Sequence, residues 1–130
     1  MILYPNAKIN IGLNILSKRD DGFHNLSSIF YPIYNCYDLI EIIKSETFMF
    51  TTSGLTIPNG KNLCVKAFEK IQSIYNISPV HIHLHKMIPI GSGLGGGSSN
   101  ASFILKALNK IFNLNLNFKE LEKISSEIGS

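Results

Sequence analysis

Alternating apolar and polar positions dominate the first part of the chain and predict β-strands. Every second residue from Ile9 to Ile15 is apolar, which indicates a strand with one buried and one polar face. Runs rich in β-branched and aromatic residues follow at 26–33, 38–43 and 48–52. The charged stretch 18–22 ends in glycine and predicts a hairpin connection between the first two strands. We therefore expect the first fifty residues to be mostly antiparallel.

Helical periodicity replaces this alternation in the rest of the chain. Apolar residues recur at three- and four-residue steps over 62–75, 104–112 and 121–128, which predicts three helices. Strict alternation returns only at 80–84, where one more strand is expected. The order of strands, helix, strand and two helices predicts one α+β domain, with its helices packed on one face of a mostly antiparallel sheet.

Several polar residues stand where helix ends are expected. Asn117 with Glu120 three residues later forms a capping-box pattern at the start of the last helix, and Gly129 is suited to end it. We expect Ser98 or Ser99 to cap the helix before it.

Composition and charge narrow the functional classes. The chain has 130 residues, of which 45% are hydrophobic and 16% charged, the balance of a folded globular domain. The net charge of +3 is scattered, which favours a small anionic ligand over nucleic acid. No apolar run approaches the length of a membrane span, so a cytoplasmic protein is expected. Cys36 and Cys64 form no metal or redox motif and are expected to be free thiols.

Five glycines between the expected strand and helix form the main candidate for chemistry. Without Cβ atoms, their backbone N–H groups can converge on an anion, and the start of the following helix adds its positive dipole end. Ser98 and Ser99 can donate hydroxyl groups or help to hold a metal ion. The pattern predicts a polyphosphate-binding loop. Its glycines are Gly91, Gly93, Gly95, Gly96 and Gly97.

Other interpretations of this loop are open to comparison. A flexible linker is one, although linkers lack a strand before and an amphipathic helix after them. A dinucleotide fold is another, because Gly91, Gly93 and Gly96 satisfy Gly-x-Gly-x-x-Gly. That fold expects an acidic residue about 20 positions further on, where Leu116 stands instead. A Walker loop is excluded, because neither Gly-Lys-Ser nor Gly-Lys-Thr occurs.

Three histidines share one face of the strand expected at 80–84. His81, His83 and His85 alternate with apolar residues, and such a triplet can bind zinc. No carboxylate or cysteine neighbours them in sequence. We favour the simpler interpretation, in which the rings line the wetter side of the sheet, and keep zinc as the alternative.

Three segments resemble the GHMP kinases. The run 89–101 is similar to their ATP-binding motif, while 5–11 and 19–24 resemble the branch that phosphorylates a cytidyl diphosphate ester in isoprenoid precursor synthesis. The resemblance implies a GHMP kinase N-terminal domain over 1–130, with a ribosomal-protein-like βαβ fold. It also implies a kinase that uses ATP and Mg²⁺ on a small-molecule hydroxyl.

The resemblance also implies roles for individual residues. Lys8 would be an active-site lysine, and Asn10 and His24 would contact the substrate, with His24 reading cytosine and Phe23 stacking on it. The family often has Tyr at the position of Phe23, but stacking needs only the ring. The alternatives are a solvated strand-end lysine for Lys8 and a turn histidine facing water for His24. The implied ATP site comprises Asn62, Leu63, Lys86, Pro89, Ile90, Gly91, Ser92, Gly93, Leu94, Gly95, Gly96, Gly97, Ser98 and Ser99.

One expected catalytic residue does not occur in the chain. In the family, the segment resembling 126–130 is followed by an aspartate that acts on the substrate hydroxyl, whereas no Asp follows Asp38 here. We therefore expect a truncated domain without its C-terminal partner, inactive alone and able at best to bind nucleotide weakly. The alternatives are another GHMP small-molecule kinase, or a non-catalytic module that binds nucleotide or RNA, since ribosomal proteins have related folds.

Overall fold

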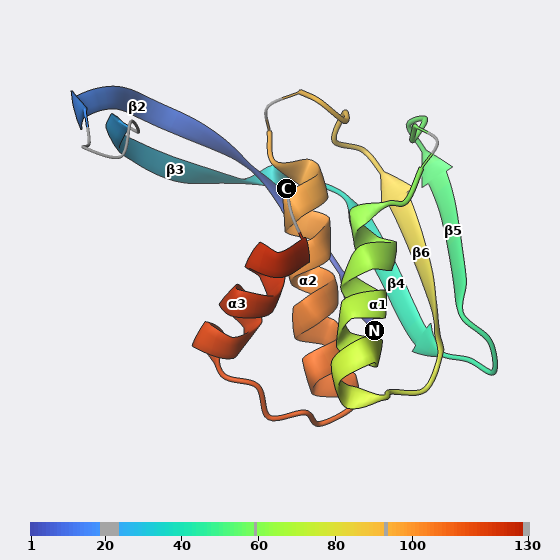
Figure 1. The fold of residues 1–130 in the computed structure, drawn as a ribbon. Helices are drawn as coiled ribbons and strands as arrows, with labels where there is room; N and C mark the ends of the chain where they lie inside the picture. Colours follow the sequence, from blue (N-terminus) through green and yellow to red (C-terminus); the bar gives the residue numbers. More distant parts are fainter. Residues whose placement is uncertain (19–23, 59, 93, 129–130) are drawn as a thin grey trace.

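The structure is a computed structural model that describes residues 1–18, 24–58, 60–92 and 94–128, and the side chains among them outside 9–31. Strands precede helices, apart from one strand between the first two helices (Figure 1). The elements are β1 (Ile2–Leu3), β2 (Asn6–Lys18), β3 (His24–Tyr37), β4 (Leu39–Lys44), β5 (Met49–Gly54), α1 (Leu63–Tyr75), β6 (Val80–Lys86), α2 (Gly96–Ile111) and α3 (Phe118–Ile128).

The described strands form two sheets. One has the order β1-β4-β6-β5, and the other is the ribbon of β2 and β3, which extends away from the helices in Figure 1. Pairing is antiparallel between β1 and β4, β4 and β6, and β2 and β3. Only β5 and β6 pair in parallel among these strands, joined through α1 as a βαβ unit. The predicted α+β class with a mostly antiparallel sheet is confirmed.

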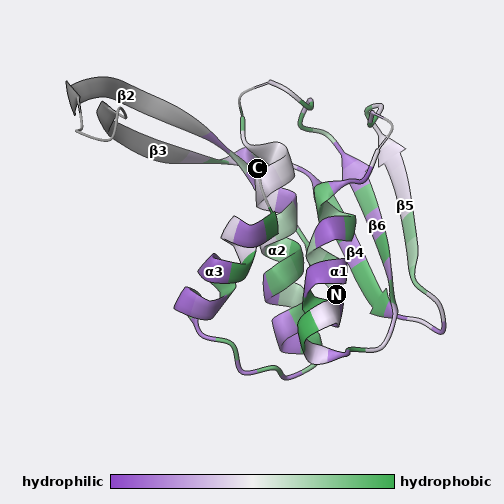
Figure 2. Cartoon of the chain, in the orientation of Figure 1, coloured by the Kyte–Doolittle hydropathy of each residue, from purple (hydrophilic) through white to green (hydrophobic). Residues whose placement is uncertain are grey.

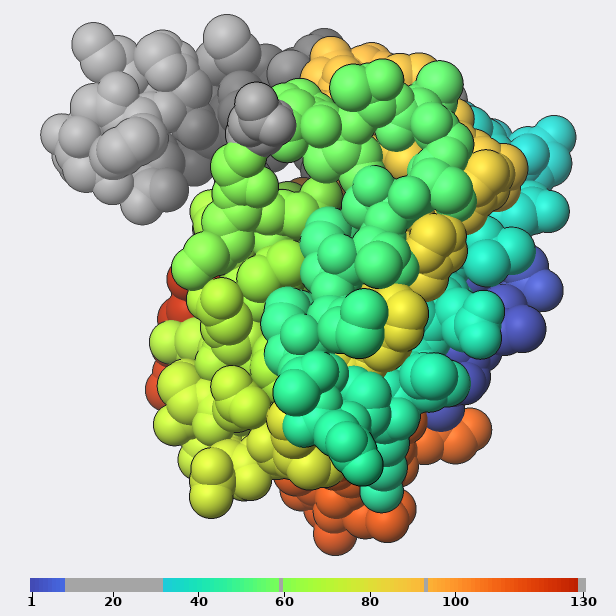
Figure 3. All heavy atoms as spheres, turned by 90° about the vertical axis from the view of Figure 1, so that its right-hand side faces the viewer, coloured from blue at the N-terminus to red at the C-terminus, as the bar shows by residue number. Residues whose placement is uncertain are grey.

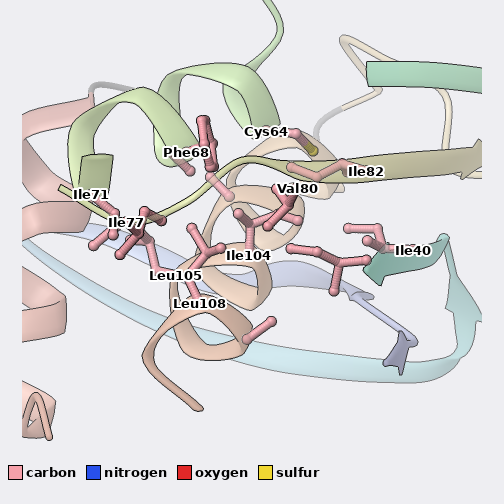
Figure 4. Packing of buried hydrophobic residues seen from close by; sticks show 14 of the residues in the cluster. Ile40, Cys64, Phe68, Ile71, Ile77, Val80, Ile82, Ile104, Leu105 and Leu108 are labelled. Atoms are coloured by element: carbon pink, nitrogen blue, oxygen red, sulfur yellow. The ribbon is translucent and has the colours of Figure 1, made fainter. Parts of the chain in front are cut away.

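The core lies between the four-stranded sheet and the helices that cover one of its faces (Figure 1). Alternate residues of β6 are buried, and the apolar stripes of α1 and α2 face them, as the hydropathy colours of Figure 2 show. Figure 4 shows Phe68 of α1 packed near Val80, and Ile104 of α2 beneath the same strand. Among the described helices, none has the length and apolar character needed to cross a membrane.

Helix caps confirm one expectation and correct another. The Asn117 side chain accepts the Glu120 N–H at 2.9 Å, and Glu120 accepts the Asn117 N–H at 3.4 Å, so the predicted capping box is present. The expectation that Ser98 or Ser99 caps α2 is wrong. The helix begins at Gly96, and its N-cap is Gly95 at φ +69°. Glycine adopts this left-handed conformation without a Cβ penalty, so the helix starts within the glycine run.

Element bounds differ from the sequence predictions mainly at their ends. β2 and β3 are longer than the apolar runs that predicted them, and the two-residue β1 was not predicted. A strand of two residues is too short to show an alternating pattern in sequence. β1 forms because it pairs with β4. The predicted connection at 18–22 lies outside the described residues except for Lys18. The predicted helix end at Gly129 lies outside them as well.

Gly54 tests how closely β5 approaches the end of β6. It has φ +85°, and a Cβ there would meet the backbone of Lys86, whereas Gly91, at φ +77°, has open space around that position. Alanine at either position is strained by the left-handed backbone conformation. Only at Gly54 does its Cβ also push the backbones of β5 and β6 apart. We expect Gly54→Ala to lower the free energy of unfolding by about 1–3 kcal/mol more than Gly91→Ala, measured by urea denaturation. Equal losses would contradict the packing argument.

Candidate functional site

A cavity of about 420 Å³ lies between the start of α1 and the segment that joins β6 to α2. Figure 3 shows these two parts of the chain, in green and amber, side by side at the top of the molecule. Most of the sequence-predicted ATP-site residues line it: Asn62, Leu63, Lys86, Pro89, Ile90, Gly91, Ser92, Gly95, Gly96, Gly97 and Ser98. Residues far apart in sequence are thus brought to one hollow.

The N-terminus of α2 opens into this cavity. The first bond of the helix runs from Ser99 N–H to Gly95 O at 3.0 Å. The N–H groups of Gly96, Gly97 and Ser98 come before it and have no acceptor within the helix. No side chain among the described residues caps this end. These amides and the positive end of the helix dipole can bind an anion.

Lys8 meets the glycine loop from the side of β2. Its backbone N–H donates to Leu94 O at 2.9 Å. Its Cε lies 2.9 Å from the place that a Cβ on Gly95 would occupy, so the side chain packs on that glycine. Lys8 is not a lining residue of the cavity. The lysine and the cavity therefore meet at Gly95 from two directions.

A buried polar cluster lies behind the loop. Asp38, Lys86 and Asn100 are 0%, 2% and 1% exposed. The Asp38 carboxylate accepts from Lys86 Nζ at 2.7 Å and from Asn100 Nδ2 at 2.9 Å, and Lys86 Nζ also donates to Asn100 Oδ1 at 3.1 Å. The other carboxylate oxygen accepts the N–H groups of Met87 and Ile88 at 2.7 and 2.8 Å. Each acceptor position of the carboxylate is thereby used.

These contacts govern ionisation in the cluster. Burial works to raise the pKa of Asp38, but the hydrogen bonds from Lys86, Ile88, Met87 and Asn100 outweigh it and hold that pKa below the usual 3.8. The carboxylate is therefore charged at neutral pH and paired with the lysine. Burial raises the pKa of the neighbouring Cys64 thiol to about 12, so this group is neutral.

The remaining predicted site residues lie elsewhere. Leu94, within the loop, and Ser99, in α2, do not line the cavity. Asn62 does line it, and its Oδ1 also caps α1 by accepting the Cys64 N–H at 2.8 Å. Asn10 lies in β2, and His24 begins β3 opposite Lys18, at the far end of the ribbon from Lys8. Gly93 and Phe23 fall outside the described residues.

Sequence reasoning missed several residues of the site. Asp38 and Asn100 were not singled out, and neither were the lining residues Ile57, Pro58, Gly60 and Lys61. The spacing of buried positions could have identified Asp38 and Asn100. Asp38 precedes the buried Ile40 and Ile42 at the same two-residue spacing. Asn100 stands four residues before the buried Ile104 and so lies on the inward stripe of α2.

The three histidines of β6 face away from the core, as expected. His81, His83 and His85 are partly exposed, while the residues between them are buried. Thr51 Oγ1 bonds the rings of His81 and His83 at 2.9 and 2.7 Å, and Ser53 Oγ bonds those of His83 and His85 at 2.9 and 2.8 Å. Hydroxyl groups of β5 therefore stand between the rings. Within the described residues, no three His, Cys, Asp or Glu side chains are grouped to hold a metal ion.

A family model confirms the class of the fold. The model of the GHMP kinases N terminal domain matches residues 62–130, which include most of the cavity lining, the glycine loop and α2. The chain belongs to the GHMP kinase family.

Two highly similar curated relatives come from one branch of this family. The chain is 53% identical, over 133 aligned positions, to the 4-diphosphocytidyl-2-C-methyl-D-erythritol kinase of Cytophaga hutchinsonii, in a match that covers 100% of this chain and 48% of that protein. It is 49% identical to the enzyme of the same name from Parabacteroides distasonis, with 100% and 48% covered. The chain thus spans about half the length of the curated relatives it matches.

Solved structures agree with this assignment. A crystal structure of 4-(cytidine 5'-diphospho)-2C-methyl-D-erythritol kinase superposes with a TM-score of 0.80 at 30% identity, covering 100% of this chain and 46% of that one. A mevalonate kinase superposes with a TM-score of 0.70 at 19% identity, covering 98% and 46%, which shows the shared fold alone.

Breaking the buried pair tests the cluster. In Lys86→Met the Asp38 carboxylate is buried without its cation, and we expect the free energy of unfolding to fall by about 3–5 kcal/mol at neutral pH. The isosteric double variant Asp38→Asn/Lys86→Met carries no unpaired charge and should lie much closer to the parent. Urea denaturation of the three proteins measures both differences.

The pH dependence of this loss has a definite sign. The lowered pKa of Asp38 stabilises the parent above the ordinary carboxyl range, and that contribution is lost as the pH falls through the folded-state pKa. In Lys86→Met, burial favours the protonated acid. The gap between parent and variant should therefore be largest at about pH 7 and smaller at about pH 3. A gap that grows toward acid would contradict the charged pair.

Proposed function

We propose that this chain provides the nucleotide-binding part of an enzyme that transfers the γ-phosphoryl group of ATP to the 2-hydroxyl of 4-diphosphocytidyl-2-C-methyl-D-erythritol, in the non-mevalonate route to isoprenoid precursors. The observation that carries the proposal is the meeting at Gly95 of the α2 N-terminus, the cavity and Lys8. The substrate follows from the names of the curated relatives that cover the whole chain.

The loop fits the phosphates of ATP. Gly95 and Gly96 have no room for a side chain, because a Cβ on Gly95 would lie 2.9 Å from Lys8 Cε and a Cβ on Gly96 would lie 2.9 Å from Ile88 Cγ2. The amides of the first helical turn, which have no acceptor within the helix, suit phosphate oxygens. Asn62 and Leu63 line the α1 side of the cavity, which supports their role beside the nucleotide base.

Phosphoryl transfer asks the protein mainly for alignment and charge stabilisation. In the reaction, the bond between the γ-phosphorus and the oxygen of the departing ADP breaks, a bond to the substrate hydroxyl forms, and the hydroxyl proton leaves to a base. Lys8 stabilises the charge that spreads over the transferred group. Mg²⁺, when bound, neutralises phosphate charge, and Ser98 at the cavity wall is suited to hold it through its hydroxyl.

The role of Lys8 can be measured in the polypeptide as the cell makes it. With ATP, Mg²⁺ and 4-diphosphocytidyl-2-C-methyl-D-erythritol, we expect Lys8→Met to lower kcat by about 10²- to 10³-fold, because one charge-stabilising donor is lost. Lys106→Met, on the outer side of α2, should leave kcat unchanged. Formation of ADP measures the rate. Absence of turnover in the parent with this substrate, but turnover with another small alcohol, would keep the family and overturn the substrate.

Crowding at Gly95 tests the loop itself. An alanine there would press on the Lys8 side chain and strain the helix N-cap, whereas Gly91→Ala introduces the same left-handed strain in open space. We expect Gly95→Ala to weaken ATP binding by about tenfold or more, and Gly91→Ala to weaken it less. Calorimetric titration with ATP and Mg²⁺ compares them. Equal effects would show that the contact between Lys8 and Gly95 is irrelevant to the nucleotide.

A further inference from the structure

Asp38 joins the parts of the chain that meet at the proposed nucleotide site. It lies between β3 and β4, and its backbone N–H donates to Pro5 O at 2.9 Å, directly before the strand that carries Lys8. Its side chain accepts from Lys86, Met87 and Ile88 at the end of β6, and from Asn100 in α2. One residue thus contacts three segments that are distant in sequence, two of them through its carboxylate and the third through its backbone N–H.

The contact continues from the carboxylate to the anion site through Ile88. The Asp38 Oδ1 holds the Ile88 N–H at 2.8 Å, and Ile88 is fully buried. The Ile88 side chain in turn lies against Gly96, where an added Cβ would be 2.9 Å from its Cγ2. Gly96 begins α2 and supplies one of the amides of the anion site. A shift of Ile88 would therefore move the start of the helix.

Stability alone does not account for this cluster. Replacing a buried ion pair with apolar groups of similar volume is often neutral or stabilising, because desolvation offsets the attraction between the charges. A carboxylate offers something that an apolar group lacks, since it can hold two backbone N–H groups and two side-chain donors in one plane. The Asp38 carboxylate therefore serves to fix the relative positions of these four donors.

We propose that Asp38 is a positioning residue of the nucleotide site. By holding the amides of Met87 and Ile88 and the side chain of Asn100, it keeps the entrance of the loop and the first turns of α2 in register with each other. The inference rests on the proposed function, because it takes ATP as the ligand of this site. Asp38 itself does not line the cavity.

Two substitutions at the same position separate hydrogen bonding from charge. Asp38→Asn removes the negative charge but keeps an oxygen that can accept the Met87 and Ile88 amides. Asp38→Ala removes the charge and the acceptors together. Both leave Lys86 without its carboxylate, so the effect of the unpaired cation is common to the pair. Ile124→Ala, in the buried face of α3 away from the loop, is the control for lost stability.

Affinity for ATP with Mg²⁺, measured by calorimetry at a temperature where each variant is folded, is the first readout. We expect Asp38→Ala to bind about 10- to 100-fold more weakly than the parent, as losses of orienting contacts commonly do. Asp38→Asn should recover a large part of that loss, and Ile124→Ala should bind like the parent. Equal weakening in Asn and Ala variants, or no weakening in either, would overturn the proposal.

Amide hydrogen exchange is the second readout, and it needs no ligand. In Asp38→Ala the hydrogen-bonded amides of Ile88 and Ser99 should exchange faster than in Asp38→Asn, while those of Ile82 in β6 keep their protection. Should Asp38→Ala fail to fold, Asp38→Ser replaces it, since one short hydroxyl cannot hold both amides. If the parent does not bind ATP, the proposed function fails, and exchange still decides whether Asp38 positions the loop. Identical exchange in both variants would overturn that role.

Discussion

The carboxylate of Asp38 is the constraint on which the arrangement of the site depends. It is fully buried, and its charge is stabilised by four donors that surround it. Those donors come from the end of β6 and from α2, which are the two ends of the glycine loop. Satisfying one buried charge thereby determines how far apart these ends lie and where the loop between them can run.

The apolar core supplies the platform for this cluster. Alternate residues of β4 and β6 are buried against α1 and α2. Asp38 continues the buried positions of β4, Lys86 those of β6 and Asn100 those of α2. The polar cluster therefore lies at the end of the core that borders the cavity. Packing orients the sheet and helices as rigid bodies, and the cluster then sets the position of the last residues before the anion site.

Much of the fold could be predicted from sequence, because periodicity reports burial directly. The alternation over His81, His83 and His85 gave the outward face of β6, and Asn117 gave the start of α3. Periodicity does not report backbone conformation, so it could not show that Gly95 takes φ +69° and starts α2 within the glycine run. Periodicity analysis looks for apolar residues at inward positions. Asp38 occupies such a position but is polar, and for that reason the sequence analysis overlooked it.

The positions of Lys8 and the cavity argue that two ligands meet at Gly95. The cavity lies on the α1 side and does not include Lys8, which packs on the same glycine from β2. In the proposed function, a nucleotide in the cavity would present its phosphates to the α2 N-terminus, with the terminal phosphate directed past Gly95 toward the lysine. An acceptor hydroxyl would then approach from the β2 side, because the base and ribose would fill the other. On this proposal the loop separates donor from acceptor.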